Sequence, residues 1–158
     1  IGLKAGATPF VLDISDKALR VARRNVNQLG LGSRVLCTDA DARKAPPMLV
    51  GSFDALLCNP PYIPSGDILM LDPSVRDYEP HLALHGGEDG LVFYRAISKN
   101  YAKALKPGGY LCFEFGMGQG DVVCQILRDC GYTVLERTMD YNQRERAVIA
   151  RYDRKEEE

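Results

Sequence analysis

The sequence predicts an α/β fold built on a mostly parallel sheet, with an antiparallel pair of strands closing it. Short apolar runs alternate with segments whose apolar residues recur at helical spacing, which is typical of strands joined by crossover helices. The last two apolar runs are close enough in sequence to form a hairpin. Its 158 residues suffice for one core. We expect one domain over residues 1–152 and a charged tail at 153–158.

The first part of the chain predicts three strands and one helix. The strands are expected at 9–14, 34–38 and 52–58, where apolar runs stand between polar and glycine-rich segments. Ser15 is a suitable N-cap for the helix that follows the first strand, and Gly30 is a suitable stop. The apolar stripe of this helix is expected to consist of Leu19, Ala22, Val26 and Leu29.

The second part continues the alternation after a long loop. Residues 59–88 are rich in Pro, Asp and Gly, and a loop of this length inside a domain usually serves a function. A helix is expected over 89–105, with a stripe of Phe93, Ile97, Tyr101 and Leu105. Residues 106–109 predict a turn into a strand at 110–115. A loop at 116–120, a helix that stops at Gly131 with a stripe of Val123, Ile126, Leu127 and Cys130, and strands at 132–139 and 147–152 complete the pattern.

Composition narrows the class of protein. The formal charge is −1, from 20 basic and 21 acidic residues without a dense basic block, so a nucleic acid is an unlikely direct substrate. The five cysteines include no Cys-x-x-Cys pair, which favours reduced thiols and a cytoplasmic location. His81 and His85 are four residues apart but lack an evident third ligand, so no metal site is predicted. No apolar stretch has the length of a membrane span.

The tetrapeptide Asn59-Pro60-Pro61-Tyr62 follows an apolar run and is the most informative motif of the chain. Neither proline has an N–H, and residues that precede a proline are held in extended conformations. The carbonyls of this corner should therefore point outward beside the Asn59 amide and the Tyr62 ring. Such a corner suits the binding of a planar –NH2 group, whose two N–H bonds would donate to Asn59 Oδ1 and to the Pro60 carbonyl. The alternative is a proline-stiffened loop without a chemical role.

Three aspartates follow the first two strands, at the edge where ligands bind in parallel sheets. Asp13 ends the first strand and could accept hydrogen bonds from ribose hydroxyls, or it could serve only the start of the helix. Asp39 and Asp41 follow the second strand. Either could accept from an exocyclic adenine amine, with Ala40 beside the ring, or could be an ordinary turn residue.

Several motifs resemble the protein-(glutamine-N5) methyltransferases of the HemK/PrmC type, a family of S-adenosylmethionine-dependent class I methyltransferases. The motifs are Asn59-Pro60-Pro61-Tyr62-Ile63-Pro64, residues 75–80 (Val-Arg-Asp-Tyr-Glu-Pro), residues 86–91 (Gly-Gly-Glu-Asp-Gly-Leu), residues 11–15, residues 106–109 and residues 144–148. The family methylates the glutamine of the Gly-Gly-Gln loop of peptide-chain release factors. The resemblance implies a Rossmann-like class I sheet, S-adenosylmethionine as the cofactor and a release factor as the protein partner.

The resemblance also assigns roles to residues. Asp13 would hold the ribose, and Asp41, or Asp39 as second choice, the adenine edge beside Ala40. Asn59 would border both cofactor and substrate, and with the Pro60 carbonyl it would orient the glutamine amide. Pro61 would belong to the same substrate corner, and Tyr62 would pack on the amide plane.

One part of the family pattern is not found in this sequence. The family's first strand and its glycine-rich loop have no counterpart before Asp13, so we expect a partial domain without the strand that would separate those ending at Asp13 and Asn59. Two other functions remain open. The same corner fits an adenine or cytosine amine in RNA or DNA, with the flipped base stacked on Tyr62. The chain could also be a non-catalytic fragment that binds a partner through an exposed sheet edge.

Overall fold

The computed structural model describes residues 6–48 and 52–153. The chain divides into two compact units, residues 1–50 and 51–158, which are considered one at a time below. All of the predicted tail at 153–158 except its first residue lies outside the described residues.

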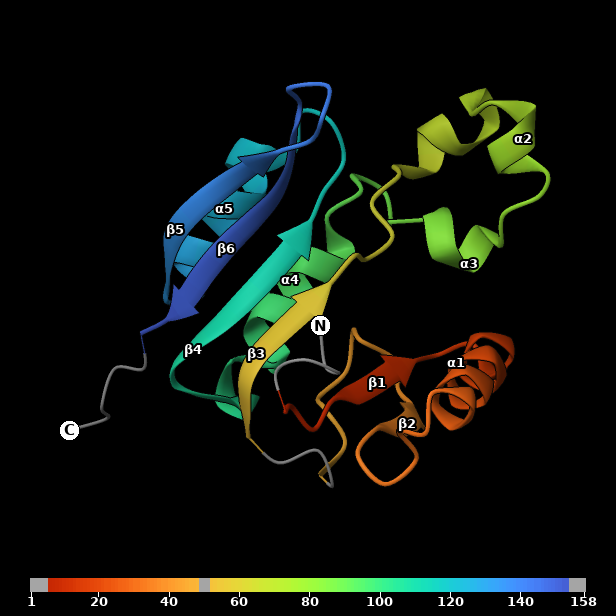
Figure 1. Cartoon of the computed structure of the whole chain (residues 1–158). Coiled ribbons are helices and arrows are strands. Elements are labelled where there is room, and N and C mark those ends of the chain that lie inside the picture. The colour runs from red at the N-terminus through yellow and green to blue at the C-terminus, as the bar shows by residue number, and fades with distance from the viewer. Residues whose placement is uncertain (1–5, 49–51, 154–158) are drawn as a thin grey trace. The chain divides into compact units, whose positions relative to one another are not determined.

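The first unit contains two parallel strands and one helix (Figure 1). Strand β1 (Phe10–Asp13) pairs with β2 (Leu36–Asp39) in a register that places Asp13 opposite Asp39. Helix α1 (Asp16–Gln28) lies between them in sequence. The Ser15 hydroxyl accepts a hydrogen bond from the Ala18 amide at 3.3 Å, which confirms Ser15 as the N-cap. Of the predicted stripe, Leu19 is buried, whereas Leu29 falls just beyond the helix and is exposed.

The second unit is a four-stranded mixed sheet in the order β3–β4–β6–β5. Strands β3 (Phe53–Cys58) and β4 (Leu105–Glu114) are parallel. Strand β6 (Glu145–Tyr152) runs antiparallel to both β4 and β5 (Tyr132–Met139). The predicted antiparallel closing hairpin is therefore present. The described strands form two separate sheets, β1–β2 in the first unit and β3–β4–β6–β5 in the second.

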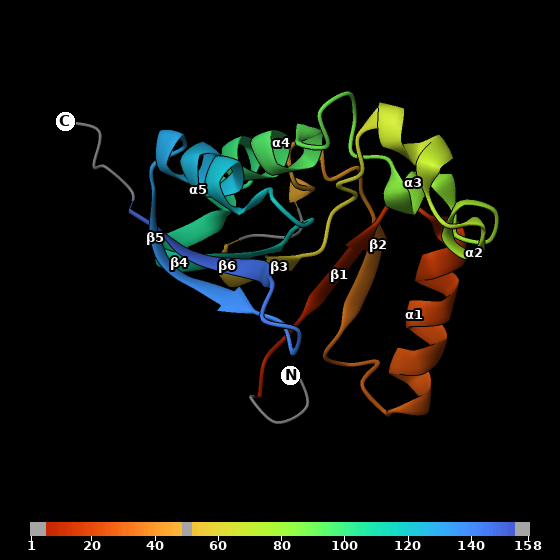
Figure 2. The same cartoon turned by 90° about the horizontal axis from the view of Figure 1, so that it is seen from above.

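Two helices, α4 (Val92–Asn100) and α5 (Gly120–Asp129), cover one face of this sheet (Figure 2). Tyr94 of α4 packs edge-on against Phe113 of β4, with the ring centroids 5.1 Å apart. The sheet contributes alternate residues to this core because the side chains of a strand point to opposite faces in turn. The buried core residues of the two helices and the sheet include Tyr94, Ile97, Leu111, Phe113, Val123, Leu127, Val148 and Ala150.

Two predicted elements differ from the structure. The helix expected over 89–105 is shorter, because α4 is followed by a 3₁₀ turn, η3 (Ala102–Ala104), and Leu105 already belongs to β4. The buried aromatic residue of α4 is Tyr94, and not Phe93 as the predicted stripe had it. Residues 106–109 form an irregularity within β4: Leu105 pairs with Phe53, and Tyr110 already pairs with Ala55. The strand thus begins before the predicted turn.

The long segment after β3 is not a plain loop. It contains the 3₁₀ helix η2 (Ser65–Met70) and two single-turn helices, α2 (Pro73–Arg76) and α3 (His81–Leu84). Figure 1 shows this excursion, in yellow-green to green, standing away from the sheet beyond the end of β3. Ile63 and His85 form an isolated parallel bridge, so both ends of the excursion are joined to each other. The excursion therefore leaves and returns at one point beside the Asn59–Tyr62 corner.

Candidate active site

Asn59 and Pro60 follow β3 directly, at the carboxyl end of the strand. Asn59 is exposed and Pro60 is buried. Within the part of the chain that the structure describes, neither the Asn59 side chain nor the Pro60 carbonyl has a hydrogen-bond partner. The corner therefore offers the two acceptors that the sequence predicted.

Tyr62 is held from several sides. Its carbonyl oxygen accepts a hydrogen bond from Nε2 of Gln119 at 2.9 Å, and Oε1 of Gln119 accepts from the Gly116 amide at 3.0 Å. A Cβ atom placed on Gly86 would stand 2.7 Å from the Tyr62 Cα, and one on Gly116 would stand 2.8 Å from the Tyr62 Cδ2. Glycine is therefore required at both positions. Gly86 and Gly116 form a closely fitting collar around Tyr62.

The residues after Tyr62 are tied to the returning end of the excursion. The Ile63 amide donates to the Leu84 carbonyl at 3.0 Å, and the Ile63 carbonyl accepts from the Gly86 amide at 2.8 Å. The Ser65 amide donates to Gly87 at 2.9 Å, and the Ser65 hydroxyl lies 2.8 Å from Nε2 of His85. The glycine-rich stretch at 86–91 therefore has a structural role: hydrogen bonds to Gly86 and Gly87 hold the residues that follow the Asn59–Tyr62 corner in place.

Groups behind the corner are neutral at physiological pH. Burial raises the pKa of the Cys58 thiol to about 12, so it carries no thiolate that could act as a nucleophile. The Tyr94 hydroxyl donates to the Glu114 carbonyl at 3.1 Å, and burial raises the pKa of this phenol as well. Neither of these two groups is ionised, so neither supplies a charge beside the corner.

In the first unit, Asp13 stands at the carboxyl end of β1. Its Oδ1 accepts from the Ser15 amide at 2.7 Å, which is the helix-start role considered from the sequence. Oδ2 has no hydrogen-bond partner among the described residues. The Asp13 carbonyl accepts from the Ala40 amide at 3.1 Å, so the ends of β1 and β2 are joined there. The carboxylate serves the helix and still has an oxygen available for a ligand.

Asp39 and Asp41 differ in what they already bind. Both oxygens of Asp41 accept from the Arg43 guanidinium, at 2.9 and 2.8 Å, and Oδ1 also accepts from the Arg43 amide. This guanidinium lowers the pKa of the Asp41 carboxyl. Asp39 is exposed, and its carboxylate has no hydrogen-bond partner in the described ranges. The geometry thus gives Asp41 the character of a turn residue and leaves Asp39 the freer acceptor.

The sequence did not single out Gln119. It lies in Gly116-Met117-Gly118-Gln119-Gly120, a run of small residues after β4 with one amide side chain. This loop follows the strand next to β3, so it reaches the same edge of the sheet as Asn59. Position at the sheet edge was a usable signal for Gln119, but its partner could not be read from the sequence.

The described residues include neither a cluster of metal ligands nor a membrane-spanning helix. No group of three or more His, Cys, Asp or Glu side chains there is arranged to hold a metal ion. His81 and His85 stack on each other, with centroids 5.4 Å apart. The described helices also include none that is long and apolar enough to cross a membrane.

Several solved structures with a similar fold are methyltransferases. The catalytic domain of human Mettl16, in a complex with an RNA hairpin, superposes with a TM-score of 0.73 at 16% identity and covers 98% of this chain and 59% of its own. A methyltransferase from Pyrococcus furiosus gives 0.67 at 15% identity, over 96% of this chain and 66% of its own. A model of the RMKL-like methyltransferase domain, UPF0020, matches residues 5–67. The fold is that of the class I methyltransferases.

The relatives that are similar in sequence point to one kind of methyltransferase. Release factor glutamine methyltransferase from Clostridium acetobutylicum is 41% identical over 87% of this chain, and that from Gloeobacter violaceus is 42% identical over 91%. The enzyme of the same name from Moorella thermoacetica is 41% identical over 95%. Over most of its length the chain is therefore similar to the release factor glutamine methyltransferases, the similarity that its motifs indicated. It spans about half the length of these relatives: 48%, 50% and 52%, respectively.

Proposed function

We propose that this protein transfers a methyl group from S-adenosylmethionine to the side-chain nitrogen of the glutamine in the Gly-Gly-Gln motif of a peptide-chain release factor. The observation that carries the proposal is the pair of unpartnered acceptors, Asn59 Oδ1 and the Pro60 carbonyl, on a rigid corner in a chain about 40% identical to enzymes named for this reaction. A primary amide offers two N–H donors to such a pair.

Asn59 and Pro60 would hold the two hydrogens of the glutamine amide. An amide nitrogen is a poor nucleophile because its lone pair is delocalised, and two acceptors on its hydrogens favour a geometry that frees the lone pair. Holding the reactants in line then supplies much of the rate. Tyr62 would pack on the plane of the amide, beside Pro61. Bound S-adenosylmethionine supplies the methyl group on a sulfonium, and the nitrogen releases one proton to water after it is methylated.

The residues of the first unit fit a nucleoside. Asp13 has an oxygen available at the end of β1, where a ribose diol could donate to it. We propose Asp39 for the adenine edge in preference to Asp41, since Arg43 already binds both Asp41 oxygens. Ala40 lies next to Asp39 and adds a small side chain beside the ring. The five cysteines are free thiols, which fits a reducing cytoplasm as the site of action.

The direct test is transfer of a labelled methyl group by the full-length protein. Purified release factor should become labelled, and the same factor with alanine in place of the Gly-Gly-Gln glutamine should not. Adenine- and cytosine-containing RNA and DNA serve as competing substrates. Label on the nucleic acid alone, with a steep dependence of binding on salt, would establish the amino-methyltransferase alternative instead.

Calorimetry on the 158-residue chain addresses the third function. Titration with S-adenosylmethionine should show binding if Asp13 and Asp39 serve a nucleoside in this chain. A folded chain that neither binds the cofactor nor methylates, but associates with itself in sedimentation experiments, would favour the non-catalytic fragment.

A further inference from the structure

We propose that Gln119 is a positioning residue for the methyl-transfer corner: its side-chain amide binds the Tyr62 carbonyl and so determines which carbonyls remain free for the substrate. This inference rests on the proposed function. It concerns a residue that touches neither substrate nor cofactor in its own right and acts through Tyr62.

The side chain of Gln119 is not used by its own helix. Gln119 is the N-cap of α5, but its side chain makes no capping hydrogen bond. The helix start is instead stabilised through the backbone, where the Gln119 amide donates to the Gly116 carbonyl at 3.1 Å and the Val123 amide donates to the Gln119 carbonyl at 3.0 Å. The side chain is therefore free to leave the helix and reach Tyr62.

Both ends of the amide are used, and this determines the residue type. Nε2 donates to the Tyr62 carbonyl and Oε1 accepts from the Gly116 amide. Tyr62 belongs to the loop after β3, and Gly116 to the loop after β4. Since Cys58 and Phe113 pair at the ends of these two strands, one side chain bridges two neighbouring loops at the same edge of the sheet. Only a side chain with a donor and an acceptor on one planar group can do so.

As a consequence, some backbone carbonyls of the corner already accept a hydrogen bond within the protein, and others do not. The Tyr62 carbonyl is bound by Gln119, and the next carbonyl, that of Ile63, is bound by the Gly86 amide at 2.8 Å. The Pro60 carbonyl has no such partner in the described part of the chain. A substrate amide is thereby directed to the Pro60 end of the corner and to Asn59, because the carbonyls of Tyr62 and Ile63 are already engaged.

Two glycines make room for this bridge. A Cβ on Gly90 would stand 2.4 Å from the Tyr62 oxygen and 2.8 Å from Gln119 Nε2. A Cβ on Gly116 would stand 2.9 Å from Gln119 Oε1. The two contact points of the amide are thus each lined by a residue without a side chain. The surroundings fit the bridge closely and leave little space for another arrangement of Gln119.

The test uses Gln119→Glu and Gln119→Met in the full-length protein. The glutamate keeps an acceptor for Gly116 but places a second oxygen against the Tyr62 carbonyl, and the methionine removes both hydrogen bonds. We expect kcat for release-factor methylation to fall on the order of 100-fold, with an unchanged KM for S-adenosylmethionine. Gln125→Met is the matched control, because Gln125 lies on the same helix and bonds only to the exposed Asp129 side chain. It should retain wild-type kcat.

Two results would overturn the positioning role. One is wild-type kcat in Gln119→Met. The other is a loss of activity that only follows the loss of folded protein, measured by thermal unfolding. Hydrogen exchange gives a readout independent of activity: the Gly116 amide should exchange faster in Gln119→Met, and unchanged protection would contradict the bond. Absence of methylation by the wild-type protein would instead remove the proposed function, so the two failures are distinguishable.

Discussion

The hydroxyl of Tyr94 donates a hydrogen bond to the backbone carbonyl of Glu114, at 3.1 Å. Tyr94 is fully buried in α4, and Glu114 is the last residue of β4. The bond therefore holds the end of the central strand against the helix that covers it. The loop that follows Glu114 contains Gly116 and Gln119, so this contact fixes the base from which the Tyr62 collar is built.

Removal of that hydroxyl should lower stability modestly. Tyr94→Phe keeps the edge-on contact with Phe113 and loses only the bond to Glu114, so we expect the free energy of unfolding to fall by about 1 kcal/mol. Chemical denaturation measures this. Tyr78→Phe is the control, because Tyr78 is exposed, and it should leave the unfolding midpoint unchanged. Equal midpoints for Tyr94→Phe and wild type would show that the bond does not contribute.

The Asn59 amide should matter for turnover and little for stability. In the full-length protein, Asn59→Ala should lower kcat on the order of 100-fold, since one of the two acceptors for the substrate amide is lost. Affinity for S-adenosylmethionine should stay nearly the same, and unfolding should shift by less than about 0.5 kcal/mol because the side chain is exposed. Turnover that survives the substitution would contradict the role of Asn59 in holding the amide.

Substitution of each of the three aspartates should change the affinity for the cofactor by a different amount. The three are Asp13, Asp39 and Asp41. Asp13→Ala and Asp39→Ala should each weaken binding of S-adenosylmethionine by about tenfold or more, because hydrogen bonds that the cofactor donates to a charged acceptor are lost. Asp41→Ala should weaken it less, because Arg43 occupies that carboxylate. Calorimetry measures the three constants. A larger loss for Asp41→Ala than for Asp39→Ala would restore the first choice made from the sequence.

The glycine collar predicts a strong difference between two similar substitutions. Gly116→Ala places a methyl group 2.8 Å from the Tyr62 ring, so we expect a destabilisation of about 1–3 kcal/mol together with loss of activity. Gly66→Ala is the control, since a Cβ there meets no atom within 4 Å. Thermal unfolding and methylation of both variants check the prediction. Equal behaviour of the two would contradict the close fit around Tyr62.

The ion pair of Asp41 and Arg43 should give a pH dependence. The hydrogen bonds from Arg43 lower the pKa of Asp41 in the folded state. The stabilisation is therefore fully present above the carboxyl's unfolded pKa and is lost as the pH falls through the lower folded value. NMR titration should show the Asp41 pKa rising toward its ordinary value in Arg43→Met. Arg20→Met, which removes a different ion pair with Asp16, should leave it unchanged.

The elements that the sequence predicted well are those with local signals. Ser15 marked the start of α1, and the strand over 132–139 has the bounds that its apolar pattern gave. The lack of an internal partner for the Pro60 carbonyl among the described residues could also be anticipated, because neither proline of the corner has an N–H to donate. Local sequence signals therefore predicted most of the secondary-structure elements, and they indicated the two acceptors of the candidate site.

The features that could not be predicted from the sequence are those that depend on contacts between residues far apart in the chain. The predicted stripe of Phe93, Ile97, Tyr101 and Leu105 was right at its last three residues, which are buried, and wrong at Phe93. Phe93 and its neighbour Tyr94 are both large, and only the contact with Phe113 selects Tyr94. The choice between Asp39 and Asp41 turned on the Arg43 side chain. Gln119 lies 57 residues from its partner Tyr62, and no periodicity links two such positions.

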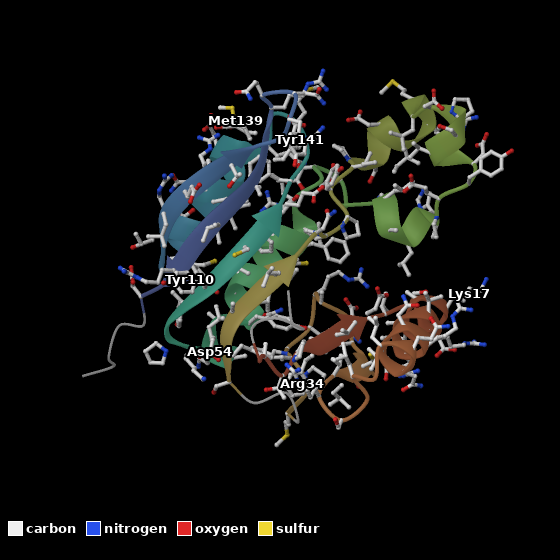
Figure 3. All side chains as sticks on the ribbon, viewed as in Figure 1. Lys17, Arg34, Asp54, Tyr110, Met139 and Tyr141 are labelled. Carbon is white, nitrogen blue, oxygen red and sulfur yellow. The ribbon has the colours of Figure 1, made fainter. Side chains whose placement is uncertain are left out.

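Exposed apolar side chains stand at the hairpin tip of the second unit. Figure 3 shows Met139 and Tyr141 at the turn between β5 and β6, and Tyr110 and Asp54 at the opposite end of the sheet. Met139 and Tyr141 are exposed, and the turn between them is closed by Asp140, whose side chain accepts from the Asn142 and Arg144 amides. The hairpin thus presents apolar side chains on a well-ordered turn.

The strand order has a consequence for biosynthesis. β6 is the last described strand along the chain, yet it lies between β4 and β5 and forms the sheet's only described link to β5. When β5 of a nascent chain has left the ribosome and β6 has not, β5 therefore lacks the strand with which it pairs. The second unit can complete its sheet only when residues 145–152 emerge, so nascent chains interrupted before that point should remain open to proteases.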